Sequence, residues 1–227
     1  MMHPVYRIYE QLMREYGPQG WWPLSSCEGE GGYHRGRYDC PRSEEEVFEV
    51  GLGAILTQNT TFSSVHKALA SLGQQQALTP QGLLALSPET LKTLIRPCGY
   101  FNQKAEYLYR FTDFFIQLHG DVPSREALLS VKGIGEETAD SILLYGYKKS
   151  EFVIDAYTER ILSHLGLIEE NARYGKVKAL MQGALEAEVD AGERVTVYQE
   201  YHALFVAHAK RFYSKKPYGE RDDILIA

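Results

Sequence analysis

The spacing of apolar residues fits helices along almost the whole chain. Between Lys104 and Leu118 they recur three or four positions apart, which places them on one helix face, and Gly120 follows where such a helix would end. The alternation typical of strands is nowhere sustained, and EFVI at 151–154 is the one short β-like piece. We therefore predict an all-α protein.

Capping residues indicate where several of these helices begin. Ser43 is followed three positions later by Glu46, the pattern of a capping box. Thr79 and Ser87 each precede a proline, which suits the first position of a helix. A further helix is expected from about 136 to 145.

The totals describe an ordinary globular chain. It has 227 residues, 44% of them hydrophobic and 24% charged, which is enough for one large domain or two lobes. No apolar run approaches the roughly 20 residues of a membrane helix, and the N-terminal stretch carries charges where a signal peptide would be apolar. We expect a cytoplasmic, nucleoid-associated protein without a membrane partner.

The cysteines and histidines suggest no metal centre. Cys27, Cys40 and Cys98 are odd in number and lack C-x-x-C spacing, so neither a disulfide framework nor a zinc site is expected. The first two lie in or beside a glycine-rich segment, 25–41, that predicts an irregular loop. Three histidines are interpreted as isolated residues without a role: His34, His66 and His164.

Charge alone argues mildly against a nucleic-acid partner. The net charge is −6, whereas phosphate binding favours a basic surface. The stretch 208–217 holds four basic residues and no acidic one. Taken alone, it is interpreted as a solvated tail.

The segment SVKGIGEETADSILL at 130–144 contains a glycine turn between two expected helices. Gly133 and Gly135 bracket Ile134, so the backbone can turn sharply and approach another surface closely. The N–H groups that open the following helix suit a phosphate. A plain corner between helices is the alternative.

Longer segments make this turn more specific. LLSVKGIGEETADSIL resembles the helix-hairpin-helix motif of DNA-binding proteins, and FVIDAYTERIL resembles the segment with the catalytic aspartate of the helix-hairpin-helix (HhH-GPD) DNA glycosylase superfamily. Asp155 follows Glu137 by 18 residues, the separation of the lysine and aspartate of endonuclease III. LGAILTQNTTFSSVHKAL and LIRPCGYFNQKAEYLYRF resemble that family's opening helices. The resemblance covers about 45–165 densely.

The resemblance implies a two-lobed all-α glycosylase fold with the active site in the cleft between the lobes. Residues 42–154 would form a six-helix barrel lobe with the hairpin, and residues 1–41 with 155–227 would form the second helical lobe. Asp155 would lie in the cleft. On local sequence alone, Asp155 could also simply cap the helix that follows it.

Asp155 and Glu137 are the expected catalytic residues. A carboxylate such as Asp155 can stabilise the sugar cation that forms as the base leaves, and can position the attacking water. Glu137 occupies the position of the lysine that forms a Schiff base in bifunctional relatives, and a carboxylate cannot do so. A monofunctional enzyme without AP lyase activity is therefore expected, although Glu137 could also be a solvated residue at a helix start. No cysteine follows Cys98, so the iron–sulfur cluster of many relatives cannot form in their manner.

WWP, LTQNTTF and KGIGEETAD together resemble the 3-methyladenine DNA glycosylases of the endonuclease III-like type. The resemblance places Trp21, Trp22, Phe62 and Lys210 at the base pocket, where aromatic faces would stack on a cationic alkylated purine. Core packing is the alternative role of the tryptophan pair.

The resemblance also assigns the contacts to DNA. Gln58 would enter the gap left by the flipped nucleotide, unless it is only a polar cap, and 99–109 would provide a second loop against the duplex. The expected DNA-binding residues are Gln58, Asn59, Lys132, Gly133, Ile134, Gly135 and Thr138. Any monovalent cation at the hairpin would lie on the carbonyl groups of Leu129, Val131 and Ile134.

The sequence thus predicts a monomeric, monofunctional DNA glycosylase that excises alkylated purines from damaged double-stranded DNA, without a required cofactor. One rival is a related glycosylase for an oxidised or deaminated base, because aromatic residues can stack on any base. The other is a helix-hairpin-helix module that binds DNA without catalysis.

Overall fold

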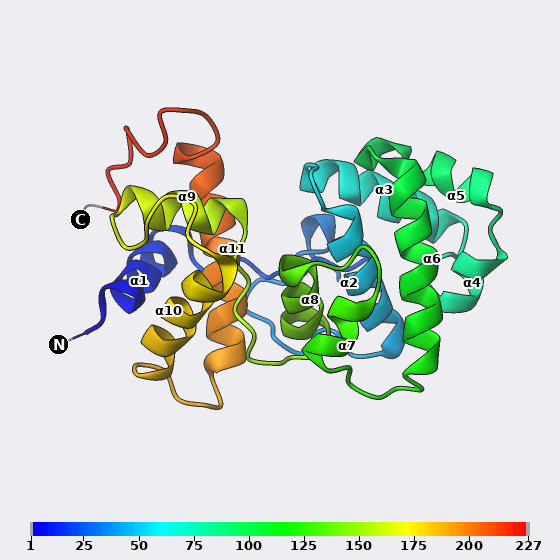
Figure 1. Ribbon diagram of the computed structural model, residues 1–227, viewed down its shortest axis with the longest axis horizontal. Helices are drawn as coiled ribbons and strands as arrows, with labels where there is room; N and C mark the ends of the chain where they lie inside the picture. Colours follow the sequence, from blue (N-terminus) through cyan, green and yellow to red (C-terminus); the bar gives the residue numbers. More distant parts are fainter. Residues whose placement is uncertain (1, 226–227) are drawn as a thin grey trace. The chain divides into compact units, whose positions relative to one another are not determined.

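The computed structural model describes residues 2–225, and none of these residues lies in a strand (Figure 1). This confirms the all-α prediction, and the β-like segment 151–154 forms no strand. No helix within the described residues is long and apolar enough to cross a membrane. The elements are α1 (Pro4–Tyr16), η1 (Glu30–Gly32), α2 (Glu44–Leu56), α3 (Phe62–Gln74), α4 (Pro80–Ala85), α5 (Pro88–Leu94), η2 (Arg96–Cys98), α6 (Phe101–Gln117), α7 (Arg125–Ser130), α8 (Glu136–Ser141), η3 (Ile142–Gly146), α9 (Ala156–His164), α10 (Tyr174–Glu186) and α11 (Arg194–Phe212).

The capping residues begin helices as their sequence predicts. The side-chain oxygens of Ser43, Thr79 and Ser87 each accept a backbone N–H group in the first turn of α2, α4 and α5. The carboxylate of Glu46 accepts the backbone N–H of Arg42, one residue before the Ser43 N–H that a capping box would use. The three predicted N-caps are therefore confirmed, and they determine where α2, α4 and α5 begin.

One helix differs from its expected form. The helix expected over 136–145 is α-helical only to Ser141 and continues as the π-helical turn η3. Such a turn inserts a residue into the i→i+4 pattern and leaves no mark in the apolar spacing. The segment 25–41 is irregular apart from the short turn η1, as expected.

The chain divides into two compact units. The terminal unit contains Met1–Trp21, Arg35–Tyr38 and Lys149–Ala227, and the hairpin unit contains Trp22–His34 and Asp39–Lys148. The segment 1–41, expected in a single lobe, is therefore divided between the two units. Residues 1–21 and 35–38 belong to the terminal unit, and residues 22–34 and 39–41 belong to the hairpin unit.

The hairpin unit has an aromatic core in which α2 packs closely on α6. The rings of Phe48 and Phe111 stack with centroids 5.8 Å apart. A Cβ atom on Gly51 would lie 2.2 Å from the Phe111 ring, so only glycine permits this approach. The ammonium group of Lys104 is buried nearby and donates to the carbonyl groups of Leu56 (2.8 Å) and Cys98 (2.9 Å). These bonds tie the end of α2 to the start of α6.

The terminal unit is built around α11, which packs against α1 and α9. Near its C-terminal end, the His208 Nε2 atom and the Tyr213 hydroxyl both lie 2.8 Å from one carboxylate oxygen of Asp222. The other oxygen accepts the backbone N–H groups of Ile224 and Leu225. The Asp222 carboxylate therefore fastens the chain that follows α11 to this helix.

Candidate active site

The glycine turn at 131–135 joins α7 to α8 in a conformation that requires glycine at one position. Gly133 has a φ angle of +96°, and a Cβ atom there would lie 2.2 Å from the ring of Tyr107. Ile134 is 6% exposed, and its N–H bonds to the Val131 carbonyl at 3.0 Å. The turn thus packs on the protein interior through the buried Ile134 side chain and against the Tyr107 ring.

The second glycine serves a different purpose. Gly135 has a φ angle of −94° and caps α8, and a Cβ atom there would meet nothing within 4 Å. Neither strain nor an internal neighbour requires glycine there; glycine is a common N-cap residue, and here it leaves the backbone surface open. Lys132 is exposed, and its ammonium group lies 2.8 Å from a carboxylate oxygen of Glu106.

Two polar contacts brace the hairpin from within the same unit. The Gln58 side-chain amide donates to the Gly133 carbonyl at 2.8 Å and lies 3.0 Å from the Thr138 hydroxyl. The Arg125 guanidinium makes a two-point contact with the buried Asp140 carboxylate at 2.7 and 3.1 Å. The sequence predicts Gln58 and Thr138 as DNA contacts, with a polar cap as the alternative for Gln58, and does not predict this bracing role. Sequence reasoning missed Arg125 and Asp140, whose separation matches no local pattern.

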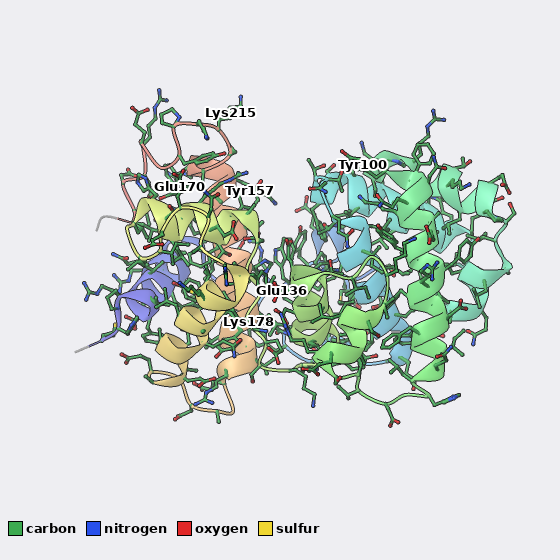
Figure 2. The ribbon with its side chains drawn as sticks, in the orientation of Figure 1. Tyr100, Glu136, Tyr157, Glu170, Lys178 and Lys215 are labelled. Carbon is green, nitrogen blue, oxygen red and sulfur yellow. The ribbon has the colours of Figure 1, made fainter. Side chains whose placement is uncertain are left out.

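Two exposed residues of the hairpin unit have unusual backbone conformations. Asn59 has a φ angle of +52° directly after Gln58. Tyr100 has a φ angle of +46°, is 68% exposed and occupies the N-cap position of α6 (Figure 2). An exposed aromatic residue in a left-handed conformation is costly for stability alone, so such positions often indicate contact with a partner.

Asp155 caps α9, as one reading of the sequence proposed. One carboxylate oxygen accepts the backbone N–H of Thr158 at 2.7 Å and its hydroxyl at 2.8 Å. The extended segment 151–154 before it is largely buried, and Phe152 packs against Tyr198 and Tyr201. The buried segment and the bonds to Thr158 therefore fix the position of the second carboxylate oxygen, Oδ2.

That second oxygen lies close to α11. His202 Nε2 is 3.7 Å from Asp155 Oδ2, and the imidazole ring meets Trp21 edge-on with centroids 6.2 Å apart. Burial would raise the pKa of Asp155, but the interaction with His202 and the bonds from Thr158 outweigh it, so the pKa lies below its ordinary value. The carboxylate, with a side chain 14% exposed, thus remains an anion. Sequence reasoning missed His202.

The four expected pocket residues divide between the units. Trp22 is 4% exposed and packs on Phe62 and Tyr145 in the hairpin unit, with centroids 5.7 and 5.2 Å apart. Trp21 and Lys210 belong to the terminal unit. Lys210 lies in the last turn of α11, and desolvation lowers the pKa of its ammonium group although the residue is exposed overall.

Glu137 lies in the first turn of α8 and is exposed. Its position agrees with a charge that complements the helix dipole. It belongs to the hairpin unit, whereas Asp155 belongs to the terminal unit. A direct catalytic part for Glu137 therefore stays a prediction.

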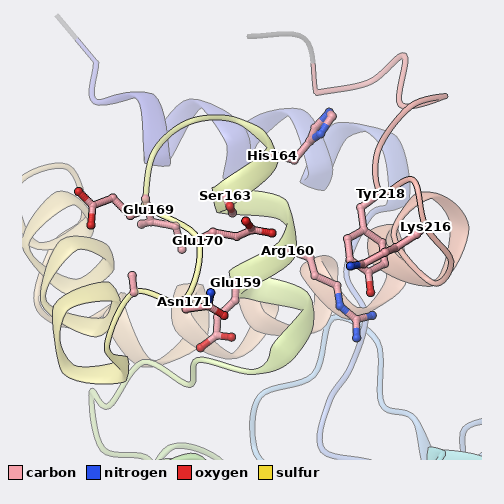
Figure 3. A pocket seen from close by; sticks show the side chains of 11 residues that line it. Glu159, Arg160, Ser163, His164, Glu169, Glu170, Asn171, Lys216 and Tyr218 are labelled. Carbon is pink, nitrogen blue, oxygen red and sulfur yellow. The ribbon is translucent and has the colours of Figure 1, made fainter.

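A cavity of about 400 Å³ lies beside α9 in the terminal unit (Figure 3). Glu159, Arg160 and His164 line it from α9, and Lys216 and Tyr218 close it from the C-terminal tail. The Arg160 guanidinium lies 4.7 Å from the centre of the Tyr218 ring and donates to a backbone carbonyl of the tail at 3.2 Å. Asp155 does not line this cavity, whose mixed charge differs from an aromatic base pocket.

Two cysteines and a histidine lie closer together than the sequence predicts. The sulfur atoms of Cys27 and Cys40 lie 3.2 Å apart, and His34, which was predicted to be isolated, lies beside them. All three residues are buried in the hairpin unit.

Comparison with known proteins assigns the fold to a family. Residues 52–187 match the model of the HhH-GPD superfamily of base excision DNA repair proteins, and the chain belongs to this family, whose members are DNA glycosylases. A Methanocaldococcus jannaschii protein assigned to the DNA repair glycosylases is 37% identical, over 93% of this chain and 90% of its own. Endonuclease III of Thermotoga maritima is 29% identical, over 79% and 91%. The solved 3-methyladenine DNA glycosylase of Helicobacter pylori, bound to 1,N6-ethenoadenine, is similar with a TM-score of 0.71 at 23% identity, over 92% and 98%. The family expected from the hairpin and Asp155 is confirmed.

Proposed function

We propose that this glycosylase excises alkylated purines of the 3-methyladenine type from double-stranded DNA, uses water as the nucleophile and leaves an abasic site. The observation that carries the proposal is the environment of Asp155, a largely buried anion that Thr158 fixes and His202 faces, with Trp21 edge-on against the His202 ring. The likeness to a 3-methyladenine DNA glycosylase supports the choice of substrate.

The target base must leave the stack before the bond to its sugar can break, at a cost of a few kcal/mol. As this bond loosens, positive charge develops on the sugar, and a fixed anion stabilises that charge more than it stabilises the ground state. Asp155 suits this role because its lowered pKa keeps it charged. The same low pKa makes it a weak base, so its main contribution is to stabilise the cation and to orient the water.

Glu137 supports hydrolysis by water. Its carboxylate stands at the position of the Schiff-base lysine of bifunctional relatives and has no amine to form that intermediate. The remaining amine assigned to the expected pocket is that of Lys210, whose pKa desolvation lowers from its ordinary value. The lyase test therefore has to include a Lys210 variant.

The aromatic side chains favour a cationic base. Trp21 presents its indole beside His202, and Phe62 packs edge-on against Trp22 at the start of α3. A cationic purine gains from stacking on such rings, by roughly 0.5–2 kcal/mol. A neutral oxidised base would gain less.

The hairpin would hold the DNA backbone. The open space at Gly135 lets a phosphate approach the backbone N–H groups, and Lys132 can exchange its exposed partner Glu106 for a phosphate at little cost. A monovalent cation on the carbonyls of Leu129, Val131 and Ile134 belongs to the same proposal. Carbonyl oxygens suit a hard cation, and the Val131 oxygen keeps a second lone pair beside its bond to Ile134 N.

The first experiment measures base release from methylated duplex DNA by chromatography, with and without later alkaline treatment. We expect released 3-methyladenine, and strand breaks only after alkali. Borohydride treatment during the reaction should trap no covalent enzyme–DNA adduct. An adduct that forms with the wild type and disappears with Lys210→Gln would refute the water mechanism and identify the nucleophile.

A second candidate is a glycosylase for oxidised or deaminated bases, which the likeness to the Thermotoga maritima endonuclease III favours. Under this alternative, methylated DNA releases no base. Duplexes with a single oxidised or deaminated base would release it instead, and the loss of activity in Asp155→Asn would be the same.

A further inference from the structure

The irregular segment between α1 and α2 brings together the ligand atoms of three buried side chains. Cys27, His34 and Cys40 each offer one atom, and these atoms all lie within 4.8 Å of one another. The two sulfur atoms are 3.2 Å apart, and the three residues are 4–7% exposed. Six residues separate the first cysteine from the histidine and five separate the histidine from the second cysteine.

One ring nitrogen of His34 makes the kind of hydrogen bond that metal-binding histidines make. His34 Nε2 lies 2.9 Å from the backbone carbonyl oxygen of Trp22. Histidines that bind metals almost always donate their second ring N–H to a carboxylate or backbone carbonyl, which fixes the tautomer and the ring plane. With Nε2–H donating to Trp22, Nδ1 is the nitrogen that carries the lone pair.

The loop around these residues is built in one tight conformation. The backbone N–H of Leu24 donates to the Gly32 carbonyl at 3.1 Å, and that of Cys27 donates to the Leu24 carbonyl at 3.1 Å. A Cβ atom at Gly32 would lie 2.4 Å from the Leu24 carbonyl oxygen, and one at Gly29 would collide with the backbone of Tyr33. Glycine at both positions lets the chain fold back so that Cys27 and His34 converge.

We propose that Cys27, His34 and Cys40 bind a zinc ion that fastens this segment within the hairpin unit. Two thiolates and one imidazole are ligands that Zn²⁺ prefers. Tetrahedral bonds of about 2.3 Å to sulfur and 2.0–2.1 Å to nitrogen place ligand atoms roughly 3.5–3.8 Å apart. To reach this geometry the two sulfur atoms, 3.2 Å apart, need to separate by about 0.6 Å, and any ligand pair near the 4.8 Å limit needs to close by about 1 Å.

Open space beside Cys27 offers a source for the fourth ligand. Cys27 lines a cavity of about 150 Å³ that also borders Phe62, His66 and Glu49. This volume holds several water molecules. Three protein ligands and one water would complete a tetrahedral site.

The proposed ion has a structural role and takes part in no step of the proposed reaction. The ion would join Cys27 and His34 to Cys40, which precedes α2 by only a few residues. Through the bond from His34, it would also hold the backbone of Trp22. Two packed thiols with an S–H···S bond, or a disulfide between Cys27 and Cys40, are the alternatives that an experiment must separate.

The test measures zinc in the full chain purified under reducing conditions without chelator. We expect about one equivalent of zinc in the wild type and in Cys98→Ser, the matched control, because Cys98 is a buried thiol outside the cluster. Cys27→Ser, Cys40→Ser and His34→Ala should each lower zinc affinity by at least tenfold in competition with a chromogenic chelator. Cobalt(II) added to the zinc-free chain should give thiolate-to-metal charge-transfer absorption in the wild type and Cys98→Ser.

A variant that fails to fold would also lose zinc, so two further measurements use the wild type alone. Zinc should raise its melting temperature and slow the alkylation of Cys27 and Cys40 relative to the zinc-free chain, whereas Cys98, which is 1% exposed, should react at the same rate with and without zinc. The proposal is overturned if the reduced wild type binds no zinc more tightly than Cys27→Ser does, or if zinc changes the alkylation rates of Cys27 and Cys40 no more than that of Cys98. A Cys27–Cys40 disulfide in mass spectra, without zinc binding after reduction, would overturn it in favour of a redox pair.

Discussion

Asp155→Asn separates the two roles of Asp155. The asparagine oxygen can still accept the Thr158 N–H that Asp155 accepts at 2.7 Å, so the cap on α9 is preserved. The negative charge that faces His202 at 3.7 Å is lost. Asp155→Ala removes both functions at once.

The two variants should therefore differ in stability and agree in activity. Loss of an N-cap costs about 1 kcal/mol, so Asp155→Ala should unfold more easily than Asp155→Asn by roughly this amount. Removal of one fixed group that stabilises transition-state charge costs roughly 100- to 1,000-fold in rate. Base release by both variants should fall by this factor, with duplex affinity nearly unchanged.

The assay is single-turnover base release with enzyme in excess, beside fluorescence anisotropy for DNA binding and urea unfolding for stability. Thr79→Ala, which removes the cap of α4 in the hairpin unit, controls for cap loss away from Asp155. If Asp155→Asn released base within about threefold of the wild-type rate, less than 1 kcal/mol of barrier, the electrostatic role of Asp155 would be refuted. A rate that falls only in Asp155→Ala would show that the residue acts through the cap.

Three other substitutions test the hairpin, the exposed Tyr100 and the C-terminal tail. Gly133→Ala should cost more than 1 kcal/mol in unfolding free energy and weaken duplex binding, because its Cβ would lie 2.2 Å from the Tyr107 ring at a positive φ. Tyr100→Gly should relieve left-handed strain and raise stability by at most about 1 kcal/mol, while anisotropy shows weaker duplex binding. Asp222→Asn should destabilise the chain at pH 7: although burial opposes it, bonds from His208 and its other partners lower the pKa of Asp222. Since the folded pKa lies below the unfolded one, the wild-type advantage in urea unfolding should be complete above about pH 4 and shrink as pH falls below it.

The features that sequence predicted well are local ones. The caps of α2, α4 and α5 depend on residues three positions apart, and the hairpin turn depends on Gly133 and its neighbour Ile134. Such short-range patterns have the same physical consequence in most surroundings. The family resemblance depended on the same segment and on the position of Asp155.

The features that sequence did not predict join distant residues. Arg125 and Asp140 lie 15 positions apart, and His202 comes from α11 to meet Asp155 on α9. No periodicity connects such pairs, because the packing of separate helices brings them together. Adjacent residues can likewise diverge: Trp21 and Trp22 were expected in one pocket, but they contribute to different units.

The bracing contacts of Gln58 would compete with its predicted insertion into the duplex. Its amide donates to the Gly133 carbonyl and lies 3.0 Å from the Thr138 hydroxyl, so insertion into a duplex would break both contacts. Each hydrogen bond is worth about 1 kcal/mol net, so the hairpin should hold Gln58 back by up to roughly 2 kcal/mol. Thr138→Val removes one contact and keeps the side-chain shape.

Thr138→Val should therefore raise affinity for a duplex with an abasic site about fivefold relative to undamaged duplex, if Gln58 inserts there. Gln58→Ala should abolish this preference and serves as the control, because it removes the inserting group. If Gln58 acts only as a brace, Thr138→Val should weaken binding to both duplexes equally, since a looser hairpin serves any phosphate backbone less well. The ratio of the two affinities, rather than either affinity alone, distinguishes insertion from bracing.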